Sequence, residues 1–479
     1  MATSELLHRC SAIRDALIEA GLFAASPGAP VSSEAGGSPN VWRIGAAPFL
    51  LTAEQVTFFE RLGPPLLSFY RALNRLYFES VRGLQPAWIA GYLDQGKPEG
   101  LVAYSRMKRF RDHLPAVIRP DVIPTSDGMV ITELDSVPGG IGLTACLSSL
   151  YADQAQPTAP LVGGRNGMIQ GFAAMLKHQR GAYPGCVAIV VSEEAKDYRP
   201  EMTWMATQLS HHGIDTYCVD PRQVKFTEDG LRLAAPEGEQ PIGLIYRFFE
   251  LFDLLNIPKS ELLQYAVKKQ SVAVTPPYKP ALEEKSAFAL LHHPVLRAYW
   301  QQELGVESFL HLTAVMPRTW VLDPAPVPPS AIIPGLSLGD RTVTNWRDLA
   351  GATQKERHFV IKPSGFSELA WGSRGVSVGH DLPQNEWVRA IESALAAYPR
   401  TPYVLQEFHK GVHYSLEYFD PAGGNMQQMS GRARLSPYYF VTGERVELAG
   451  ILATICPADK KVIHGMRDAV MVPCAGPSL

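Results

Sequence analysis

Cysteine is scarce in this chain, and the few cysteines have no spacing that would bind a metal or build a disulfide framework. The 479 residues include six cysteines, none in a CxxC pair, and most stand in apolar stretches such as GCVAIVV. Thiols in such surroundings are usually reduced and buried. The sequence therefore predicts neither a zinc site nor a disulfide-stabilised secreted domain.

Long apolar runs and an excess of charge of one sign are also absent. No run approaches the roughly 18 apolar residues of a membrane span, and the charged N-terminus has no signal-peptide core. The formal net charge is −3, which gives no general attraction to nucleic acid or to a membrane surface. We expect a cytoplasmic protein that acts on small molecules, with no nucleic-acid or membrane partner.

What the chain does have is length for several domains, since 479 residues exceed what one hydrophobic core usually organises. Apolar residues recur at helical spacing in 5–22 and 53–82, so the first hundred residues are predicted to be mainly helical. Residues 185–220 have the pattern of a buried strand, an amphipathic helix and a second strand, which is a βαβ unit. An α/β subdomain is therefore predicted at 161–275.

The last part of the chain carries a second group of predicted strands. The proline-rich segment 322–335 is expected to be a surface connection. After it come a strand at 358–364 that ends near Lys362, a glycine-interrupted loop at 365–379, a helix at 385–398, and strands at 402–411 and 412–420.

Residues 116–140, AVIRPDVIPTSDGMVITELDSVPGG, are predicted to form a hairpin with its charged residues on one face. A three-residue loop at 126–128 sets two facing pairs, Arg119 with Asp135 and Asp121 with Glu133. Directly opposed residues share a sheet face, so three carboxylates and one arginine converge. The other face carries Ile118, Val122, Val130 and Leu134. A two-residue loop of Asp127 and Gly128 would shift the pairing by one residue and scatter the charges.

Two interpretations of this hairpin remain open on its own residues. Three carboxylates in one patch repel unless cations intervene, and their hard oxygen atoms suit Mg²⁺ that bridges to substrate phosphates. The arginine would face the same phosphates. A solvated sheet face with one salt bridge accounts for the same residues without any function.

Lys362 and the residues after it have the pattern of a phosphate-binding element. A glycine-rich loop can present N–H donors to phosphates beside a fixed positive charge. The candidates in this loop are Gly372, Ser373, Arg374 and Gly375. The strand YVLQEF then ends in Gln406, Glu407 and Phe408, whose backbone can offer donors and acceptors to adenine, with the Glu407 carboxylate for ribose hydroxyls.

The order of lysine strand, glycine-rich loop and Q-E strand resembles the ATP-grasp superfamily, whose fold holds ATP between two antiparallel sheets. In the usual members the metal-binding E-x-N segment comes after these elements, whereas here ELDSVPGGIGLT lies far upstream of Lys362. This inversion is similar to the circularly permuted ATP-grasp proteins, which include the synthetase domain of glutathionylspermidine synthase. The R-x-D and E-x-N signature of that enzyme is matched by Arg119, Asp121, Glu133 and Asp135, with Asp in place of Asn.

The resemblance implies a fold, a reaction and a set of site residues. The implied fold class is α+β, a permuted ATP-grasp fold with an α/β subdomain and a helical N-terminal segment. The four parts would be the helices at 1–100, the metal-binding hairpin at 101–160, the substrate-side subdomain at 161–275 and the ATP-binding part at 276–479. The implied reaction is an ATP- and Mg²⁺-dependent C–N ligation of a carboxylate and an amine through an acylphosphate, with a peptide or polyamine among the substrates considered.

Residue by residue, the resemblance assigns roles to the charged positions. Mg²⁺ would be held by Asp121, Glu133 and Asp135, and Arg119 would stabilise the transferring phosphoryl group. The Asn-to-Asp change keeps an oxygen ligand but adds a charge, which can alter the number or affinity of metals. Lys285 is a second candidate lysine on the nucleotide side. Candidate substrate contacts are Thr144, Arg247 and Arg434.

Two alternatives come from other functional classes. A regulatory module could retain the ATP pocket without turnover, although ATP binding alone does not need the whole charged set. An oxidoreductase could use the glycines of 138–144, but that requires a helix to start at once and an acidic partner about twenty residues on, for which Asp153 is a weak candidate. We expect instead that the glycines turn the backbone away after Asp135 so that Thr144 can approach substrate.

Overall fold

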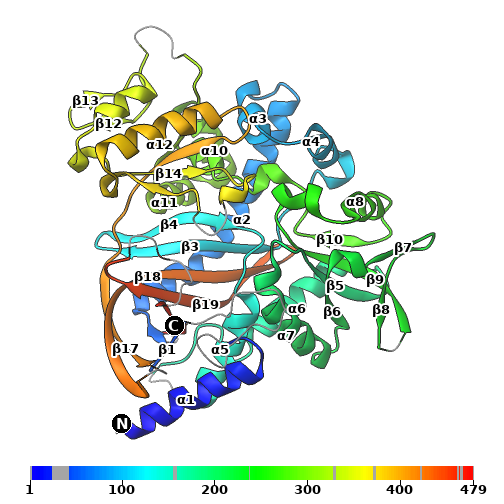
Figure 1. The fold of residues 1–479 in the computed structure, drawn as a ribbon. Helices are drawn as coiled ribbons and strands as arrows, with labels where there is room; N and C mark the ends of the chain where they lie inside the picture. Colours follow the sequence, from blue (N-terminus) through cyan, green and yellow to red (C-terminus); the bar gives the residue numbers. More distant parts are fainter. Residues whose placement is uncertain are drawn as a thin grey trace.

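The computed structural model describes residues 3–23, 42–154, 159–236, 238–326, 331–370, 374–420, 423–460, 463 and 468–477. Within these ranges the chain forms sheets of eight, six, four and two strands, packed with helices (Figure 1). None of the helices described there is both long and apolar enough to cross a membrane. All six cysteines are free thiols, as predicted.

The eight-stranded sheet brings the predicted hairpin together with the C-terminal strands. Its order is β17 (His413–Asp420), β1 (Arg43–Gly45), β20 (Val470–Ala475), β19 (Arg445–Pro457), β18 (Asn425–Thr442), β3 (Val117–Thr125) and β4 (Gly128–Asp135), with β2 (Phe49–Leu50) beside β20. The hairpin β3–β4 is thus one edge of this sheet, and β4 is the outer strand.

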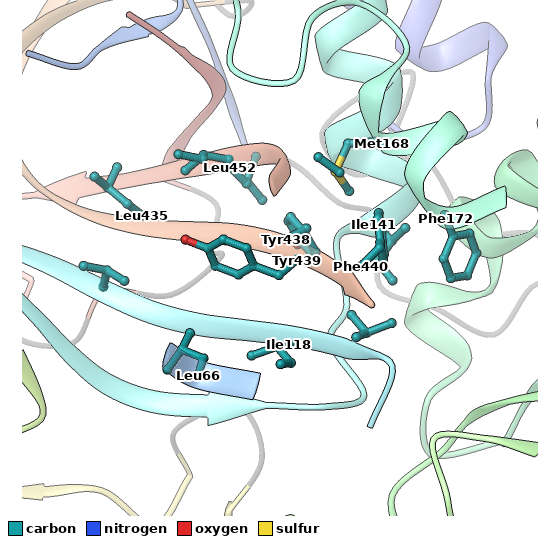
Figure 2. Close-up of a cluster of buried hydrophobic side chains, with 14 of the residues drawn as sticks. Leu66, Ile118, Ile141, Met168, Phe172, Leu435, Tyr438, Tyr439, Phe440 and Leu452 are labelled. Atoms are coloured by element: carbon teal, nitrogen blue, oxygen red, sulfur yellow. The ribbon is translucent and has the colours of Figure 1, made fainter. Parts of the chain in front are cut away.

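Helices cover both faces of this sheet (Figure 2). On one face lies α2 (Ala53–Val81), whose Phe59 carbonyl accepts a hydrogen bond of 2.6 Å from the Tyr439 hydroxyl. On the other, Phe172 of α6 (Gly167–Arg180) lies 5.4 Å from Phe440 between ring centroids. Consecutive strand residues point to opposite faces, so Tyr439 and Phe440 extend the core in both directions. The remaining helices of this region are α1 (Thr3–Glu19), α3 (Ala87–Asp94), α4 (Glu99–Ser105) and α5 (Ile141–Gln154).

The six-stranded sheet contains the predicted βαβ unit. Its strands are β5 (Cys186–Val191), β6 (Thr216–Val219), β7 (Lys225–Thr227), β8 (Gly230–Ala235), β9 (Gly238–Phe248) and β10 (Ala273–Thr275), flanked by α7 (Arg199–His211) and α8 (Ser260–Lys268). β5 runs parallel to both β6 and β9 and is buried along its whole length. A central parallel strand covered on both faces has such an uninterrupted apolar sequence.

The four-stranded sheet carries Lys362. It has the order β11 (Thr319–Val321), β16 (Tyr403–Glu407), β14 (Phe359–Pro363) and β15 (Ser377–Val378). Phe359 and Ile361 share a hydrophobic core with Trp387 of α12 (Gln384–Ala397), so Lys362 points from the opposite face. The predicted strands at 402–411 and 412–420 both occur, but β16 and β17 belong to different sheets. Nearby elements are α9 (Ser286–His292), α10 (Arg297–Leu304), α11 (Val306–Val315), β12 (Ser337–Leu338) and β13 (Arg341–Thr342).

Candidate functional site

The hairpin brings its charged residues together, but not through the predicted loop. Thr125 pairs with Gly128, so the loop consists of Ser126 and Asp127 and is neither the predicted three-residue loop nor the Asp127-Gly128 alternative. A β-bulge then inserts Thr132 between the partners of Asp121 and Val122 and restores the register. The two predicted pairs therefore hold, Arg119 with Asp135 and Asp121 with Glu133.

The bulge also changes what lies on the two faces. The prediction placed Val122 and Val130 on the same face of the hairpin. In the structure Val122 pairs with Ile131, and Val130 pairs with Ile123 on the opposite face. The Thr132 carbonyl accepts a hydrogen bond of 3.2 Å from the Nζ atom of Lys362. One extra residue in β4 thus connects the edge of the eight-stranded sheet to the four-stranded sheet.

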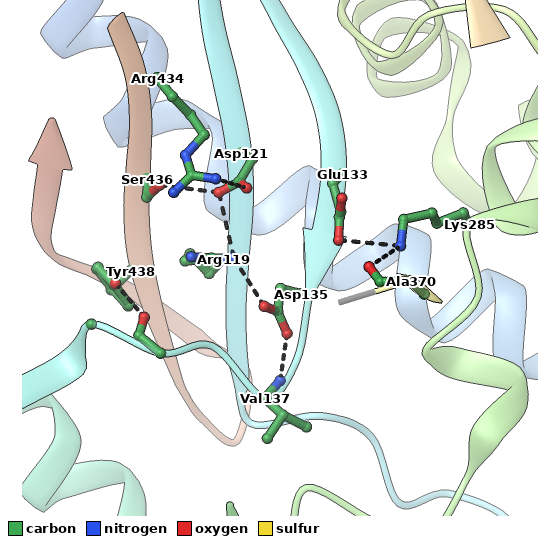
Figure 3. Close-up of polar contacts among 12 residues, drawn as sticks. Arg119, Asp121, Glu133, Asp135, Val137, Lys285, Ala370, Arg434, Ser436 and Tyr438 are labelled. Atoms are coloured by element: carbon green, nitrogen blue, oxygen red, sulfur yellow. Dashed lines mark hydrogen bonds and ion pairs between the residues drawn. The ribbon is translucent and has the colours of Figure 1, made fainter. Parts of the chain in front are cut away.

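Seven charged side chains meet at the hairpin and form what we call the charged cluster: Arg119, Asp121, Glu133, Asp135, Lys285, Lys362 and Arg434. Asp121 lies at its centre and is 6% exposed. Its carboxylate accepts from the Arg434 guanidinium at 3.1 Å and from the Ser436 hydroxyl at 3.0 Å, and Arg119 lies 3.5 Å away (Figure 3). Burial alone would raise the pKa of Asp121, but the two arginines and the Ser436 hydrogen bond hold it below its usual value. Arg434, predicted as a substrate contact, therefore pairs with a proposed metal ligand.

The other two carboxylates have different surroundings. Asp135 accepts hydrogen bonds of 2.9 Å from Arg119 and from the Val137 N–H. Burial raises the pKa of Asp135, with a further contribution from the nearby Glu133 charge. Glu133 is more open, and its carboxylate lies 3.4 Å from the Nζ atom of Lys285 (Figure 3). The structure therefore brings Lys285 to the hairpin, and its role as a second nucleotide-side lysine stays a prediction.

Lys362 is anchored by Gln406 as well as by the bulge. Its Nζ atom donates to the Gln406 side-chain oxygen at 2.8 Å, and the Gln406 amide in turn donates to the Thr319 hydroxyl at 3.2 Å. Burial lowers the pKa of Lys362 to about 8, although Glu133 and Asp121 favour its charged form. Gln406 thus orients the lysine, a function that the sequence pattern did not indicate.

The backbone of the Q-E strand is less available to adenine than predicted. β16 has a neighbouring strand on each side, and its N–H groups are already used at the end of the strand. The Glu407 N–H donates to the Arg318 carbonyl and the Phe408 N–H to the His358 carbonyl, both at 2.9 Å. Neither N–H is free for a base while this sheet is intact, which corrects that part of the prediction.

The glycine-rich loop is described in part, because Gly372 and Ser373 lie outside the described residues. Arg374 reaches the loop after β5, where its guanidinium lies 3.3 Å from the Glu194 carboxylate. At Gly375 a side chain would press against Pro363, and at Gly365 a Cβ atom would overlap the Glu283 carbonyl oxygen. The loop therefore follows a close path between β14 and the segment that carries Glu283.

The glycines after Asp135 do begin a helix at once, contrary to our expectation. α5 starts at Ile141, and its first N–H groups are taken by a carboxylate of α7. Glu201 accepts hydrogen bonds from the Gly140 N–H at 2.6 Å and the Leu143 N–H at 2.9 Å. Burial raises the pKa of Glu201 to about 7, against the lowering effect of these hydrogen bonds. A side-chain carboxylate thus stands where a dinucleotide phosphate would bind, which disfavours the oxidoreductase alternative.

Two predicted substrate contacts are engaged inside the protein. The Thr144 side chain is fully buried, and its hydroxyl donates to the Gly140 carbonyl at 2.6 Å. Arg247 is also fully buried. Its guanidinium donates to the carbonyls of Pro276, Phe249 and Pro277 and pairs with Glu283. Neither side chain is therefore open to a substrate. The sequence could not show this, because the neighbours of a residue in the chain do not reveal its internal partners.

Two small hollows of about 10 Å³ border the charged cluster, whereas clefts of about 700 and 780 Å³ open elsewhere. One hollow lies beside Glu133, Lys285 and Gln406. The second lies at the carboxyl ends of β5 and β9, where ligands of open parallel sheets usually bind. Its lining includes Glu194, Glu250 and Asp253. Among the described residues, neither wide cleft is lined by lysine together with carboxylates and arginines, as the cluster is, so the cluster is the candidate site.

The donor set suits a hard divalent cation, although it is not gathered into a finished metal site. Among the described residues, no three His, Cys, Asp or Glu side chains are placed to hold a metal together. The carboxylates of Asp121, Glu133 and Asp135 share one strand face but contact arginine and lysine side chains. Oxygen ligands of this kind fit Mg²⁺, which commonly takes one or two carboxylates and completes its shell with water and substrate phosphates.

Comparison with known proteins gives a fold but no family. No family model and no curated protein matches the sequence. A glutathione synthetase-like effector from Globodera pallida, solved in its apo form, has a similar structure, with 12% identity, a TM-score of 0.58 and coverage of 99% of this chain and 98% of that one. The chain thus has the fold of a glutathione synthetase-like protein. A Methylobacillus flagellatus KT protein described as a gamma-glutamylcysteine synthetase reaches a TM-score of 0.43 at 10% identity, covering 87% of this chain and 88% of its own.

Proposed function

We propose that this protein is a circularly permuted ATP-grasp ligase that joins a carboxylate to an amine and releases ADP and phosphate, similar to glutathionylspermidine synthase. One observation carries the proposal, the meeting of charged side chains from several elements where two sheets face each other. The cluster has four cationic side chains and three carboxylates, namely Arg119, Lys285, Lys362 and Arg434 with Asp121, Glu133 and Asp135. This balance suits a triphosphate that carries Mg²⁺.

ATP would bind between the Lys362 face of the four-stranded sheet and the β4 edge. Bound Mg²⁺ would be held by Asp121, Glu133 and Asp135 and would neutralise phosphate charge. Lys362, oriented by Gln406, would hold a phosphate group as a fixed point charge. Because the hollow beside Glu133 has a volume of about 10 Å³, the two sheets must separate to admit a nucleotide, which breaks the bond between Lys362 and Thr132. In this proposal 101–160 and 276–479 supply the ATP site and 161–275 the substrate side, with 1–100 packed around them.

The reaction would proceed through an acylphosphate. The substrate carboxylate attacks the γ-phosphorus and ADP leaves. A neutral amino group then attacks the acyl carbon, and phosphate and a proton leave as the amide forms. Arg119, which is paired with Asp121 and Asp135 in the structure, would stabilise charge on the transferring phosphoryl group. The contact between Arg374 and Glu194 joins the glycine-rich loop to the α/β subdomain. A loop held in this way would keep water from the intermediate.

The second hollow supports a cationic amine as the other substrate. Three carboxyl groups line it, from Glu194, Glu250 and Asp253. Burial and the nearby Glu283 raise the pKa of Glu250 well above its usual value. A positively charged amine bound beside Glu250 would favour the charged form of this carboxyl group, as an opposite charge does for any buried carboxylate. An amino group of a polyamine or of a basic peptide has the required charge.

The test is ADP and phosphate release from Mg-ATP in the presence of pooled carboxylates, including glutathione, small peptides and amino acids, and pooled amines. The wild type is compared with Glu133→Ala and with Glu60→Ala, a matched change on the exposed surface of α2. We expect substrate-dependent ADP release in the wild type and in Glu60→Ala. Glu133→Ala should lose most of it, because a proposed Mg²⁺ ligand is removed.

Two other outcomes have distinct meanings. Tight Mg-ATP binding without ADP release in any pool would favour the regulatory module over the ligase. Absence of Mg-ATP binding in the folded wild type would overturn the ATP-grasp assignment. Isothermal titration on the same samples separates these cases.

A further inference from the structure

A cleft of about 700 Å³ opens away from the charged cluster, between α2, the segment 109–116, the end of α6 and the turn between β18 and β19. Small-molecule pockets usually have volumes of roughly 300–1,000 Å³ and often lie where structural units meet. This cleft lies where the eight-stranded and six-stranded sheets approach each other. The proposed ligase reaction does not use it.

Arginine dominates the charged lining of this cleft. The five arginines are Arg71, Arg75, Arg82, Arg109 and Arg111, against two carboxylates, Asp112 and Glu444. Arg71 pairs with Glu444 at 2.6 Å, and Arg75 pairs with Glu303 at 2.8 Å. In the described ranges the other three arginines have no carboxylate at ion-pair distance; Arg82 donates to the Phe78 carbonyl and Arg109 to the Lys268 carbonyl. An uncompensated positive charge therefore faces the cleft.

The segment 109–116, which carries Arg109 and Arg111, forms one wall of the cleft. A buried lysine anchors the backbone of this wall. Lys279 is 2% exposed, and its Nζ atom donates to the carbonyls of Arg111 and His113, both at 2.9 Å. It also donates to the Asn74 side chain on α2, and Asn74 donates to the Arg111 carbonyl at 2.8 Å. This network ties the backbone of the wall to α2. The arginine side chains of the wall remain exposed, but the backbone that carries them is fixed. Less backbone entropy is therefore lost when a ligand binds.

The cleft also has an apolar side. Leu67, Phe78, Phe110 and Val441 contribute to its lining between the charged residues. A pocket that combines apolar surface with a few convergent charged groups selects organic ions rather than bare ones. Planar guanidinium groups favour phosphate and carboxylate groups through paired hydrogen bonds.

We propose that this cleft is a second ligand site, which binds a small organic molecule with several negative charges through Arg82, Arg109 and Arg111. The shared chemistry is that of an organic phosphate or a polycarboxylate. Occupancy of the site is independent of whether the protein is a ligase. The ligand would bridge α2 and the 109–116 wall.

Titration calorimetry in magnesium-free buffer tests the proposal with two probes, ADP for organic phosphates and citrate for polycarboxylates. The first variant carries Arg82→Gln, Arg109→Gln and Arg111→Gln, all on exposed side chains, so that folding is retained. The control carries Arg341→Gln, Arg389→Gln and Arg400→Gln, which remove the same charge from exposed positions elsewhere. A third variant, Lys362→Met, removes the candidate phosphate contact of the other site.

We expect one probe to bind the wild type, the control and Lys362→Met alike, and to bind the cleft variant at least about tenfold more weakly. The probe that binds identifies the anionic group. Loss of binding in Lys362→Met with full binding in the cleft variant would assign the ligand to the charged cluster and overturn the proposal. Equal weakening in the cleft variant and the control, or no saturable binding of either probe to the wild type, would also overturn it.

Discussion

Lys97 and Glu284 form an ion pair inside the protein, with 2.5 Å between their Nζ and Oε1 atoms and side chains 0% and 1% exposed. Lys97 lies in the loop between α3 and α4. Both neighbours of Glu284 in the sequence also form ion pairs, Glu283 with Arg247 and Lys285 with Glu133. The pair therefore ties the helical N-terminal segment to the charged cluster, and this gives those helices a structural role that the sequence did not reveal.

A double-mutant cycle measures the coupling between these two residues. Replacing one partner leaves a buried charge alone, so Lys97→Met or Glu284→Gln should each lower the free energy of unfolding by about 3–5 kcal/mol. The double variant should lose less than the sum of the two, because no uncompensated charge remains. Urea denaturation provides the three values. Strictly additive losses would contradict a direct interaction.

The pKa of Lys362 predicts how ATP affinity depends on pH. Burial lowers this pKa to about 8, so the free protein loses the positive charge as the pH rises above that value. Phosphate binding requires the charged form, and ATP affinity should fall by up to about tenfold per pH unit above pH 8, since one proton is linked to binding. Titration calorimetry between pH 6.5 and 9.5 would measure this slope.

Lys362→Arg is the control for this dependence. A guanidinium stays charged throughout that range, so the variant should show a flat pH profile even if its geometry weakens binding overall. The linked effect on stability has the opposite sense. Because the unfolded lysine keeps its proton to higher pH than the buried one, the wild type should gain stability as the pH rises from about 8 towards 10.5. An identical pH profile in both proteins would show that Lys362 is not the titrating group.

The hairpin shows how far the sequence could predict the site. Alternation of apolar and charged residues correctly predicted the strands and the facing of Asp121 with Glu133. The predicted loop length was wrong. A two-residue loop with a bulge at Thr132 gives the same register at Asp121 and Glu133 as a three-residue loop without a bulge. Nothing in the residues around Thr132 distinguishes these solutions. The extra residue, Thr132, contacts the four-stranded sheet, which contributes Lys362 from far along the chain.

Other parts of the site depend on tertiary contacts that no local pattern encodes. The carboxylate of Glu201 reaches the N-terminus of α5 because α7 packs against it, and a Cβ atom at Gly142 would overlap the Glu201 carbonyl oxygen. The sequence therefore predicted a turn at the glycines of 139–142, whereas Gly142 allows the close approach of α7. By contrast, buried strands such as β5 were predictable, because a strand covered on both faces is apolar throughout.

Glu201 gives a prediction on stability that does not depend on the proposed reaction. Its carboxyl pKa is raised by burial to about 7, so the folded protein binds more protons than the unfolded chain between about pH 4.5 and 7. The contribution of this group should therefore fall as the pH rises through that window, by about 3 kcal/mol for the full shift. Glu201→Gln removes the titration, and the difference in unfolding free energy between variant and wild type should change across the window. A constant difference from pH 4.5 to 7.5 would contradict the raised pKa.

Gly365 is expected to tolerate no side chain, because the loop after β14 passes directly over the Glu283 carbonyl oxygen. In Gly365→Ala either the loop or the segment carrying Glu283 and Lys285 must shift, at a cost of about 1–3 kcal/mol. The shift would move the loop that follows Lys362, so ATP binding should weaken more than the loss of stability alone explains. Gly100→Ala in α4 is the matched control, since a Cβ atom there meets no neighbour within 4 Å. A helical alanine should leave stability unchanged or raise it by up to about 1 kcal/mol. Equal ATP affinity in the two folded variants would show that the path of this loop does not affect the nucleotide site.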